Sequence, residues 1–106
     1  MLCCGRKIKI EAAFASEPIW CSVCKSNIPI DDIPIKQELI QELQEWNRAF
    51  SVWLVDYKFK STEEYFELET RHNQWGNELT ERIKKELGHA FFIVFAPSNL
   101  SLYMYG

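Results

Sequence analysis

Two cysteines at short spacing are the residues of the sequence with the clearest potential for chemistry. Cys21 and Cys24 lie in the segment Trp20-Cys21-Ser22-Val23-Cys24-Lys25. Two thiols at this spacing can exchange with a disulfide, because one attacks as a thiolate and the other resolves the mixed disulfide. The same spacing supplies half of a tetrahedral zinc site. The pair therefore raises two chemical hypotheses, a redox site and a metal site.

The segment resembles the W-C-x-x-C-K active site of thioredoxins, and it follows a predicted strand and a short loop. This resemblance implies Cys21 and Cys24 as catalytic residues, with Cys21 attacking from a helix N-terminus. It covers only six residues, and its spacer is Ser-Val instead of Gly-Pro. Pro29 and Pro34 obstruct a helix starting at Cys24, and no closing helix follows, although Ala96-Pro97-Ser98 faintly resembles the proline loop of that family.

A zinc site needs ligands in addition to Cys21 and Cys24, and the sequence offers Cys3, Cys4, His72 and His89. Adjacent cysteines cannot chelate as a C-x-x-C turn does. His72 falls on the predicted buried stripe of a helix, and His89 falls at a helix end, where a structural role is commoner. We favour a third interpretation, in which Cys21 and Cys24 are semi-buried thiols that pack as small hydrophobes. No cofactor is then expected, and zinc is the alternative to test.

Carboxylate pairs and other catalytic motifs add little. Asp31-Asp32 and Glu63-Glu64 are acids of the kind that stabilise helix starts or solvate a surface. The four glycines form no phosphate-binding loop, and neither G-x-S-x-G nor H-E-x-x-H occurs. The sequence therefore gives no support to an enzyme, and we lean toward a non-enzymatic protein.

The first half of the chain predicts a strand, a long loop and a helix. Residues 7–14 alternate, with one apolar face formed by Ile8, Ile10, Ala12 and Phe14. Three prolines between residues 15 and 34 indicate an ordered loop with short extended pieces. A stripe with three- and four-residue spacing predicts a helix from about Lys36 to Phe50, whose end between Phe50 and Phe59 stays open.

The second half predicts another helix and a hairpin. Ser61-Thr62-Glu63-Glu64 is a capping box and Gly88 a left-handed stop, whereas Gly76 in mid-helix indicates a bend or a close neighbour. Residues 90–96 are apolar on both faces, which predicts a covered central strand, and residues 100–105 alternate again. The expected core is Ile8, Ile10, Phe14, Leu39, Leu43, Trp46, Trp75, Leu79, Ile83, Phe92 and Val94.

These elements predict an α+β two-layer sandwich in the order β-α-α-β-β, with a small antiparallel or mixed sheet packed on two helices. If the helices form an antiparallel pair, the central strand runs opposite to the first. With 106 residues and no repeat or linker, the chain is expected to be a single α/β domain over residues 1–106.

Composition limits the partners. The net charge of -3 and the pI near 5.4 favour neither nucleic acid nor an anionic membrane surface. No apolar run is long enough to span a bilayer, and the N-terminus turns polar at Arg6 and Lys7 before a signal peptide could develop. We therefore expect a cytoplasmic protein.

A broader resemblance runs from about Pro18 to Phe95. The features Pro18-Ile19-Trp20, Asn27-Ile28-Pro29, Ile33-Pro34-Ile35, Leu39 to Leu43 with Trp46, and Glu86-Leu87-Gly88 are similar to a family of small uncharacterised bacterial proteins. The cysteine pair is not general in that family, so the resemblance implies that thiol chemistry is not its shared function. It carries no established activity.

The leading functional hypothesis is a non-enzymatic bacterial protein that binds a protein partner, of the immunity or accessory type. The loop from Pro18 to Pro34 combines length, prolines and apolar residues without a periodic place to bury them. Its predicted contact residues are Ile19, Trp20, Lys25 and Asn27. The alternative is a thiol-disulfide redox or zinc-binding protein that uses Cys21 and Cys24.

Overall fold

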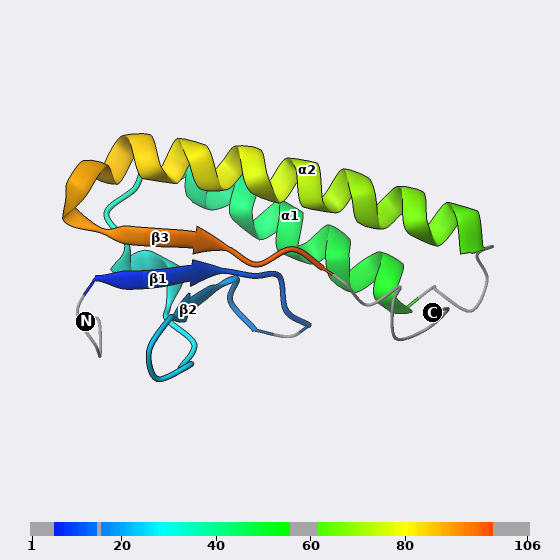
Figure 1. The fold of residues 1–106 in the computed structure, drawn as a ribbon, viewed down its shortest axis with the longest axis horizontal. Coiled ribbons are helices and arrows are strands. Elements are labelled where there is room, and N and C mark those ends of the chain that lie inside the picture. Colours follow the sequence, from blue (N-terminus) through cyan, green and yellow to red (C-terminus); the bar gives the residue numbers. More distant parts are fainter. Residues whose placement is uncertain (1–5, 15, 56–61, 99–106) are drawn as a thin grey trace.

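The fold is an α+β sandwich of two layers. The computed structural model describes residues 6–14, 16–55 and 62–98. Its elements are β1 (Lys7–Ile10), β2 (Ile19–Cys21), α1 (Gln37–Val55), α2 (Thr62–Leu87) and β3 (Phe92–Phe95), with short 3-10 helices at Ile30–Asp32 and Gly88–Ala90. Figure 1 shows both α-helices on the same side of the small sheet. The predicted fold class is confirmed, whereas the alternating residues 100–105 lie outside the described residues.

The sheet has the strand order β2-β1-β3. β1 is antiparallel to β2, where Ile8 faces Cys21, and parallel to β3, where Ile8 faces Ile93. The prediction that β3 runs opposite to the first strand was therefore wrong, and among the described strands the central one is β1. The reason is β2, which lies in the segment expected to be a loop. It reverses the chain once before the helical hairpin, so that the chain returns parallel to β1 (Figure 1).

Among the described residues, the fully buried side chains of the sheet lie on the face that meets the helices. Its inner side chains are fully or almost fully buried: Ile8, Ile10, Ile19, Cys21 and Ile93. Phe92 and Val94 point the other way and are 66% and 38% exposed, and Phe14 is 58% exposed. Their assignment to the core was wrong. β1 ends at Ile10, before Phe14, and Phe92 and Val94 alternate with inward Ile93 on a strand covered from one side.

The helices supply much of the remaining core, as their periodicity predicts, and the segment between β2 and α1 adds Ile28, Ile30 and Ile33. Leu39, Leu43 and Trp46 of α1 and Leu79 and Ile83 of α2 are buried, and Trp75 packs against them while partly exposed. α1 continues to Val55 as a helix, which settles the open boundary up to that residue. Gly88 adopts a φ of +63°, so the predicted left-handed stop at the end of α2 is confirmed.

Gly76 marks a close approach between α2, α1 and the sheet. A Cβ atom at this position would lie 2.6 Å from Trp46 Cζ2 and 2.6 Å from Phe95 Cε1. The Trp46 ring is fixed in turn, because it stacks on His72 at 4.6 Å and donates from Nε1 to the His72 carbonyl at 2.9 Å. The close neighbour expected from a mid-helix glycine is therefore present.

Candidate partner-binding surface

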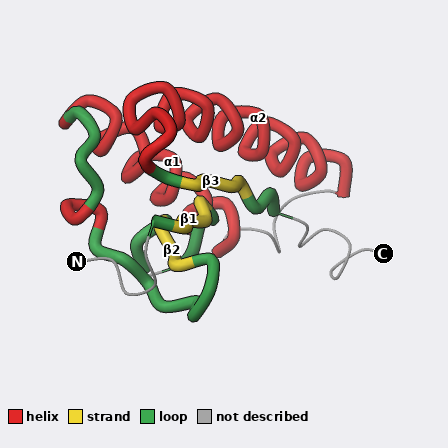
Figure 2. The backbone as a smooth tube through the Cα atoms, turned by 60° about the vertical axis from the view of Figure 1, so that its left-hand side comes forward, coloured by secondary structure: helices red, strands yellow, loops and turns green. Residues whose placement is uncertain are grey.

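The sheet presents a face that no described helix covers. We call this the outer face and define it by Lys7, Lys9, Trp20, Phe92 and Val94. The register places Trp20, Lys9 and Val94 side by side on the three strands, with Lys7 beside Phe92. Figure 2 shows the strands lying along one side of the helix layer. Aromatic, aliphatic and cationic side chains thus share one exposed surface.

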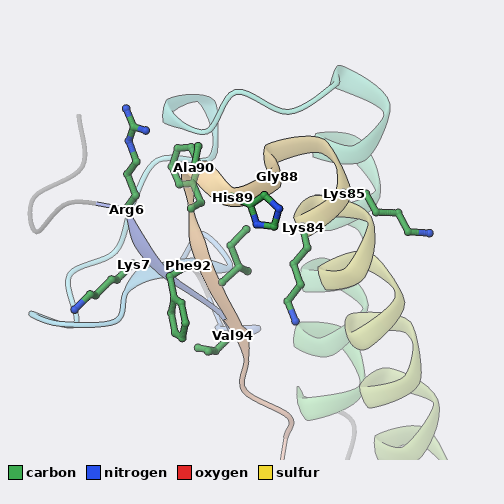
Figure 3. Close-up of a pocket in the computed structure, with 11 residues that line it drawn as sticks. Arg6, Lys7, Lys84, Lys85, Gly88, His89, Ala90, Phe92 and Val94 are labelled. Carbon is green, nitrogen blue, oxygen red and sulfur yellow. The ribbon is translucent and has the colours of Figure 1, made fainter.

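A groove of about 990 Å³ adjoins the outer face where β3 begins. Figure 3 shows Phe92 and Val94 along β3, with Lys7 on one side of the strand and Lys84 and His89 on the other. The cations of its lining are Arg6, Lys7, Lys84 and Lys85. The described residues that form the groove include no carboxylate. The hollow is therefore basic, although the chain as a whole carries a net charge of -3.

Two of these cations have local partners. The guanidinium carbon of Arg6 lies 5.5 Å from the centre of the Phe91 ring, a cation-π contact that holds it at the groove's end. Lys84 Nζ lies 3.3 Å from Glu81 Oε1 on the same exposed helix surface. An exposed pair of this kind contributes about 0–1 kcal/mol, so Lys84 can exchange Glu81 for another carboxylate at little cost.

The segment that was predicted to bind a partner is ordered mainly by internal contacts. Ile19 is fully buried, so the prediction that it is displayed on the surface was wrong. Trp20 is half-buried, and its Nε1 donates to the Glu11 carbonyl at 3.0 Å. Lys25, at a φ of +68°, donates from Nζ to the Ser22 carbonyl at 3.2 Å. Within this segment, Trp20 is the predicted contact residue that the structure places on the outer face.

The Asn27 side chain fixes the strand that precedes it by hydrogen bonds. Its Nδ2 donates to the carbonyls of Glu17 and Ile19 at 2.7 and 3.1 Å, and its Oδ1 accepts from the Glu17 amide at 3.1 Å. Asn47 of α1 does the same for the preceding turn, accepting from Ala13 N–H and donating to the Ser16 carbonyl, both at 2.7 Å. These amides hold β2 in register, a role that the sequence pattern did not indicate for Asn47.

The two cysteines differ in their environments. Cys21 is 2% exposed at the end of β2, within the hydrophobic core, whereas Cys24 is exposed and its Sγ lies 2.9 Å from Ser26 Oγ. Residues 22–24 form a turn, so Cys21 does not sit at the helix N-terminus that activates the attacking thiol of a thioredoxin. The packing interpretation fits Cys21, and Cys24 lies outside the core.

Metal-ligating side chains do not gather in the described part of the chain. Over residues 6–14, 16–55 and 62–98, no group of three or more His, Cys, Asp or Glu residues could hold a metal ion. Cys3 and Cys4 lie outside these ranges. His89 lines the groove as an exposed residue, whereas His72 is buried in the core as predicted.

His72 belongs to a buried polar cluster at the opposite end of the sheet from the groove. Burial lowers its pKa to about 4, and the nearby Glu69 carboxylate opposes this shift. Beside it, Asn73 Oδ1 accepts from the Ser98 amide at 2.7 Å, and the Ser98 hydroxyl bonds Glu69 at 2.9 Å. This cluster ties the chain after β3 to α2, so its role is structural.

Sequence reasoning missed Phe92 and Val94 as surface residues. A fully apolar strand fits either a strand covered on both sides or a strand with one face reserved for a partner. The number of helix layers that the chain can form around the sheet distinguishes these two kinds of strand. Two helices that pack side by side cover a single face of a sheet, and no further helix or strand was available on the other side among the described elements.

No described helix combines the length and the apolar character needed to cross a bilayer.

A comparison with curated proteins finds no match to this chain. A model of a protein family described as Serratia CdiI immunity protein-like does match, over residues 6–98. That range contains both α-helices, the three strands and every residue of the outer face. The chain therefore belongs to the Serratia CdiI immunity protein-like family.

Proposed function

We propose that this chain is an immunity protein that binds a protein toxin and blocks it, and that the outer face is its contact surface. Membership of an immunity protein-like family supports the first part. The observation that carries the second is the sheet, which has helices on one face and exposed Phe92 and Val94 on the other. Exposed apolar patches rimmed by polar residues are typical of protein-binding sites.

The outer face combines the side chains that contribute most to protein interfaces. Aromatic residues and arginine are enriched at the energetic centres of such contacts. Phe92 lies beside Lys7 and Trp20 beside Lys9, so each aromatic ring has a cation as its cross-strand neighbour. Trp20 is also held by its bond to Glu11. A residue that is already ordered loses little side-chain entropy on binding.

The test is capture of a candidate toxin, taken from the open reading frames that neighbour this gene. The tagged chain should retain that toxin on an affinity column and should restore growth when the two are co-expressed. Phe92→Ala should weaken binding by about 2 kcal/mol or more, which is roughly 30-fold in Kd. Because Phe92 is 66% exposed, the substitution should leave the thermal midpoint nearly unchanged.

The matched control is Phe66→Ala, which removes an aromatic side chain that is 42% exposed on α2, in the helix layer. It should leave toxin capture unchanged. Equal losses from Phe92→Ala and Phe66→Ala would contradict the outer face as the contact surface. Failure of the unmodified chain to capture or neutralise the toxin would contradict the immunity function itself.

A further inference from the structure

The groove beside β3 has a charge opposite to that of the chain. Four of the twelve lysines and arginines of the sequence line it, Arg6, Lys7, Lys84 and Lys85, and of these Lys85 points its side chain away from β3 (Figure 3). None of the described carboxylates lines it. A hollow with one sign of charge and low-dielectric walls attracts ligands of the opposite sign. The chemistry of the groove therefore selects an occupant with negative charge.

The groove also follows the outermost strand of the described sheet. β3 ends the order β2-β1-β3. The Phe92 amide donates to the Arg6 carbonyl at 2.8 Å, toward β1. Successive backbone groups of a strand alternate in direction, so the amides of Ile93 and Phe95 point to the other edge. An extended chain can add to such an edge by backbone hydrogen bonds.

The side chains along β3 add a requirement for apolar contacts. Phe92 and Val94 protrude next to the cations, and both are exposed. In a pleated pair, alternate residues of an added strand face the same side as these two. A segment that alternates apolar and acidic residues would present apolar side chains to Phe92 and Val94 and carboxylates to the side where Lys84 lies. A small inorganic anion would satisfy only the cations.

We propose that the groove binds an acidic, extended segment of the partner protein, which pairs with the outer edge of β3. Its apolar residues share the outer face with Phe92 and Val94, and its carboxylates point to the opposite side, toward Lys84 of α2. Lys7 adds to the positive potential of the groove from the outer face. This inference rests on the proposed function, because it takes the partner to be a protein. The net charge of -3 disfavours a nucleic acid, whose long chain of phosphates would meet the acidic remainder of the surface.

The test uses the isotope-labelled full chain and a synthetic peptide of about eight residues in which Val and Glu alternate. Backbone amide NMR signals should shift most at Ile93 and Phe95. Raising NaCl from about 50 to about 500 mM should weaken binding, because salt screens the carboxylates from Lys7 and Lys84. The double variant Lys7→Glu, Lys84→Glu should weaken binding by about tenfold or more.

The matched control is Arg48→Glu, Arg71→Glu. It changes the net charge equally, and like Lys84 its Arg71 has an ion pair with a glutamate one helical turn away. This control should bind the peptide as the unmodified chain does. A peptide of alternating Val and Lys should not bind.

In the peptide assay, three outcomes would overturn the inference: equal binding of the Val-Lys peptide, shifts that avoid Ile93 and Phe95, or preferential binding of a single-stranded DNA oligonucleotide to the groove. The peptide assay does not use the toxin, so the two proposals fail separately. Peptide binding without toxin capture would overturn the immunity function alone. Toxin capture that is indifferent to Lys7→Glu, Lys84→Glu would overturn the acidic-segment inference alone.

Discussion

Replacing Gly76 by alanine tests whether contacts or local propensity decide the stability of α2. In an exposed helix this change stabilises by about 1 kcal/mol, because glycine has more backbone freedom to lose. Here the new Cβ would lie 2.6 Å from both Trp46 Cζ2 and Phe95 Cε1. Carbon atoms in ordinary contact are about 3.5–4.0 Å apart, so the overlap is close to 1 Å on two sides.

The loss of stability caused by Gly76→Ala depends on whether Trp46 or Phe95 can move away from the new methyl group. Trp46 cannot shift readily, because it is stacked on His72 and hydrogen-bonded to the His72 carbonyl. Phe95 is partly exposed near the end of β3 and can move more easily. Inserting a methyl group into a tight core costs about 1–3 kcal/mol. Because the new methyl overlaps two neighbours, we take the cost as about 2–3 kcal/mol, and after the gain in propensity of about 1 kcal/mol we expect Gly76→Ala to destabilise the fold by about 1–2 kcal/mol.

Urea unfolding at constant pH measures this loss, and a thermal scan should show a midpoint lower by about 5–10 °C. Asn77→Ala is the control, because it introduces alanine at the next, exposed position and should stabilise by up to about 0.7 kcal/mol. Adding Phe95→Leu to Gly76→Ala should recover part of the loss. Stabilisation by Gly76→Ala, or identical effects at Gly76 and Asn77, would refute the close approach.

Three further predictions follow from the core. Lowering the pH from about 7 to about 4.5 should reduce the free energy of unfolding by about 2 kcal/mol, because unfolded His72 gains a proton near its ordinary pKa of 6.5 whereas folded His72 does so only near 4. His72→Gln should flatten this part of the stability profile measured in urea. Leu79→Ala should cost about 2–5 kcal/mol and Glu45→Ala under about 0.5, and equal costs in urea would contradict the helix phase. Cys24→Ser should leave thermal stability unchanged, whereas Cys21→Ser places a hydroxyl in the core and should cost about 1–3 kcal/mol. Stoichiometric zinc in the purified chain would contradict the packing role of Cys21.

The different effects expected at the two cysteines follow from the structure and not from the sequence. The sequence treated Cys21 and Cys24 alike, because neither falls in a periodic segment. The structure separates them, since β2 directs Cys21 inward and the turn after it leaves Cys24 exposed. A three-residue strand is too short for alternation to reveal it.

The helices were predictable because each repeats its apolar spacing over many residues. Leu39, Leu43 and Trp46 are buried as that spacing indicates, and so are Leu79 and Ile83. The direction of β3 was not predictable in the same way. It depends on whether the chain reverses an odd or an even number of times after β1, and the short strand β2 adds one reversal.

The outer face shows why a binding site can be missed in sequence analysis even when most helices and strands are predicted correctly. Apolar patterning identifies residues that avoid water, but a partner removes water from Phe92 and Val94 as effectively as a core does. Net charge is a similarly incomplete guide to a binding site, because it does not show where the charges lie on the surface. The net charge of -3 is an average that favours no acidic ligand, whereas Lys7 of β1 and Lys84 of α2, far apart in sequence, line the same hollow only because β3 runs between them. Parallel pairing of β1 and β3 brings the N-terminal cations beside the C-terminal end of α2. Had β3 run opposite to β1, as the sequence suggested, the start of β3 and the end of α2 would lie at the other end of the sheet, away from Lys7, and the groove would not form.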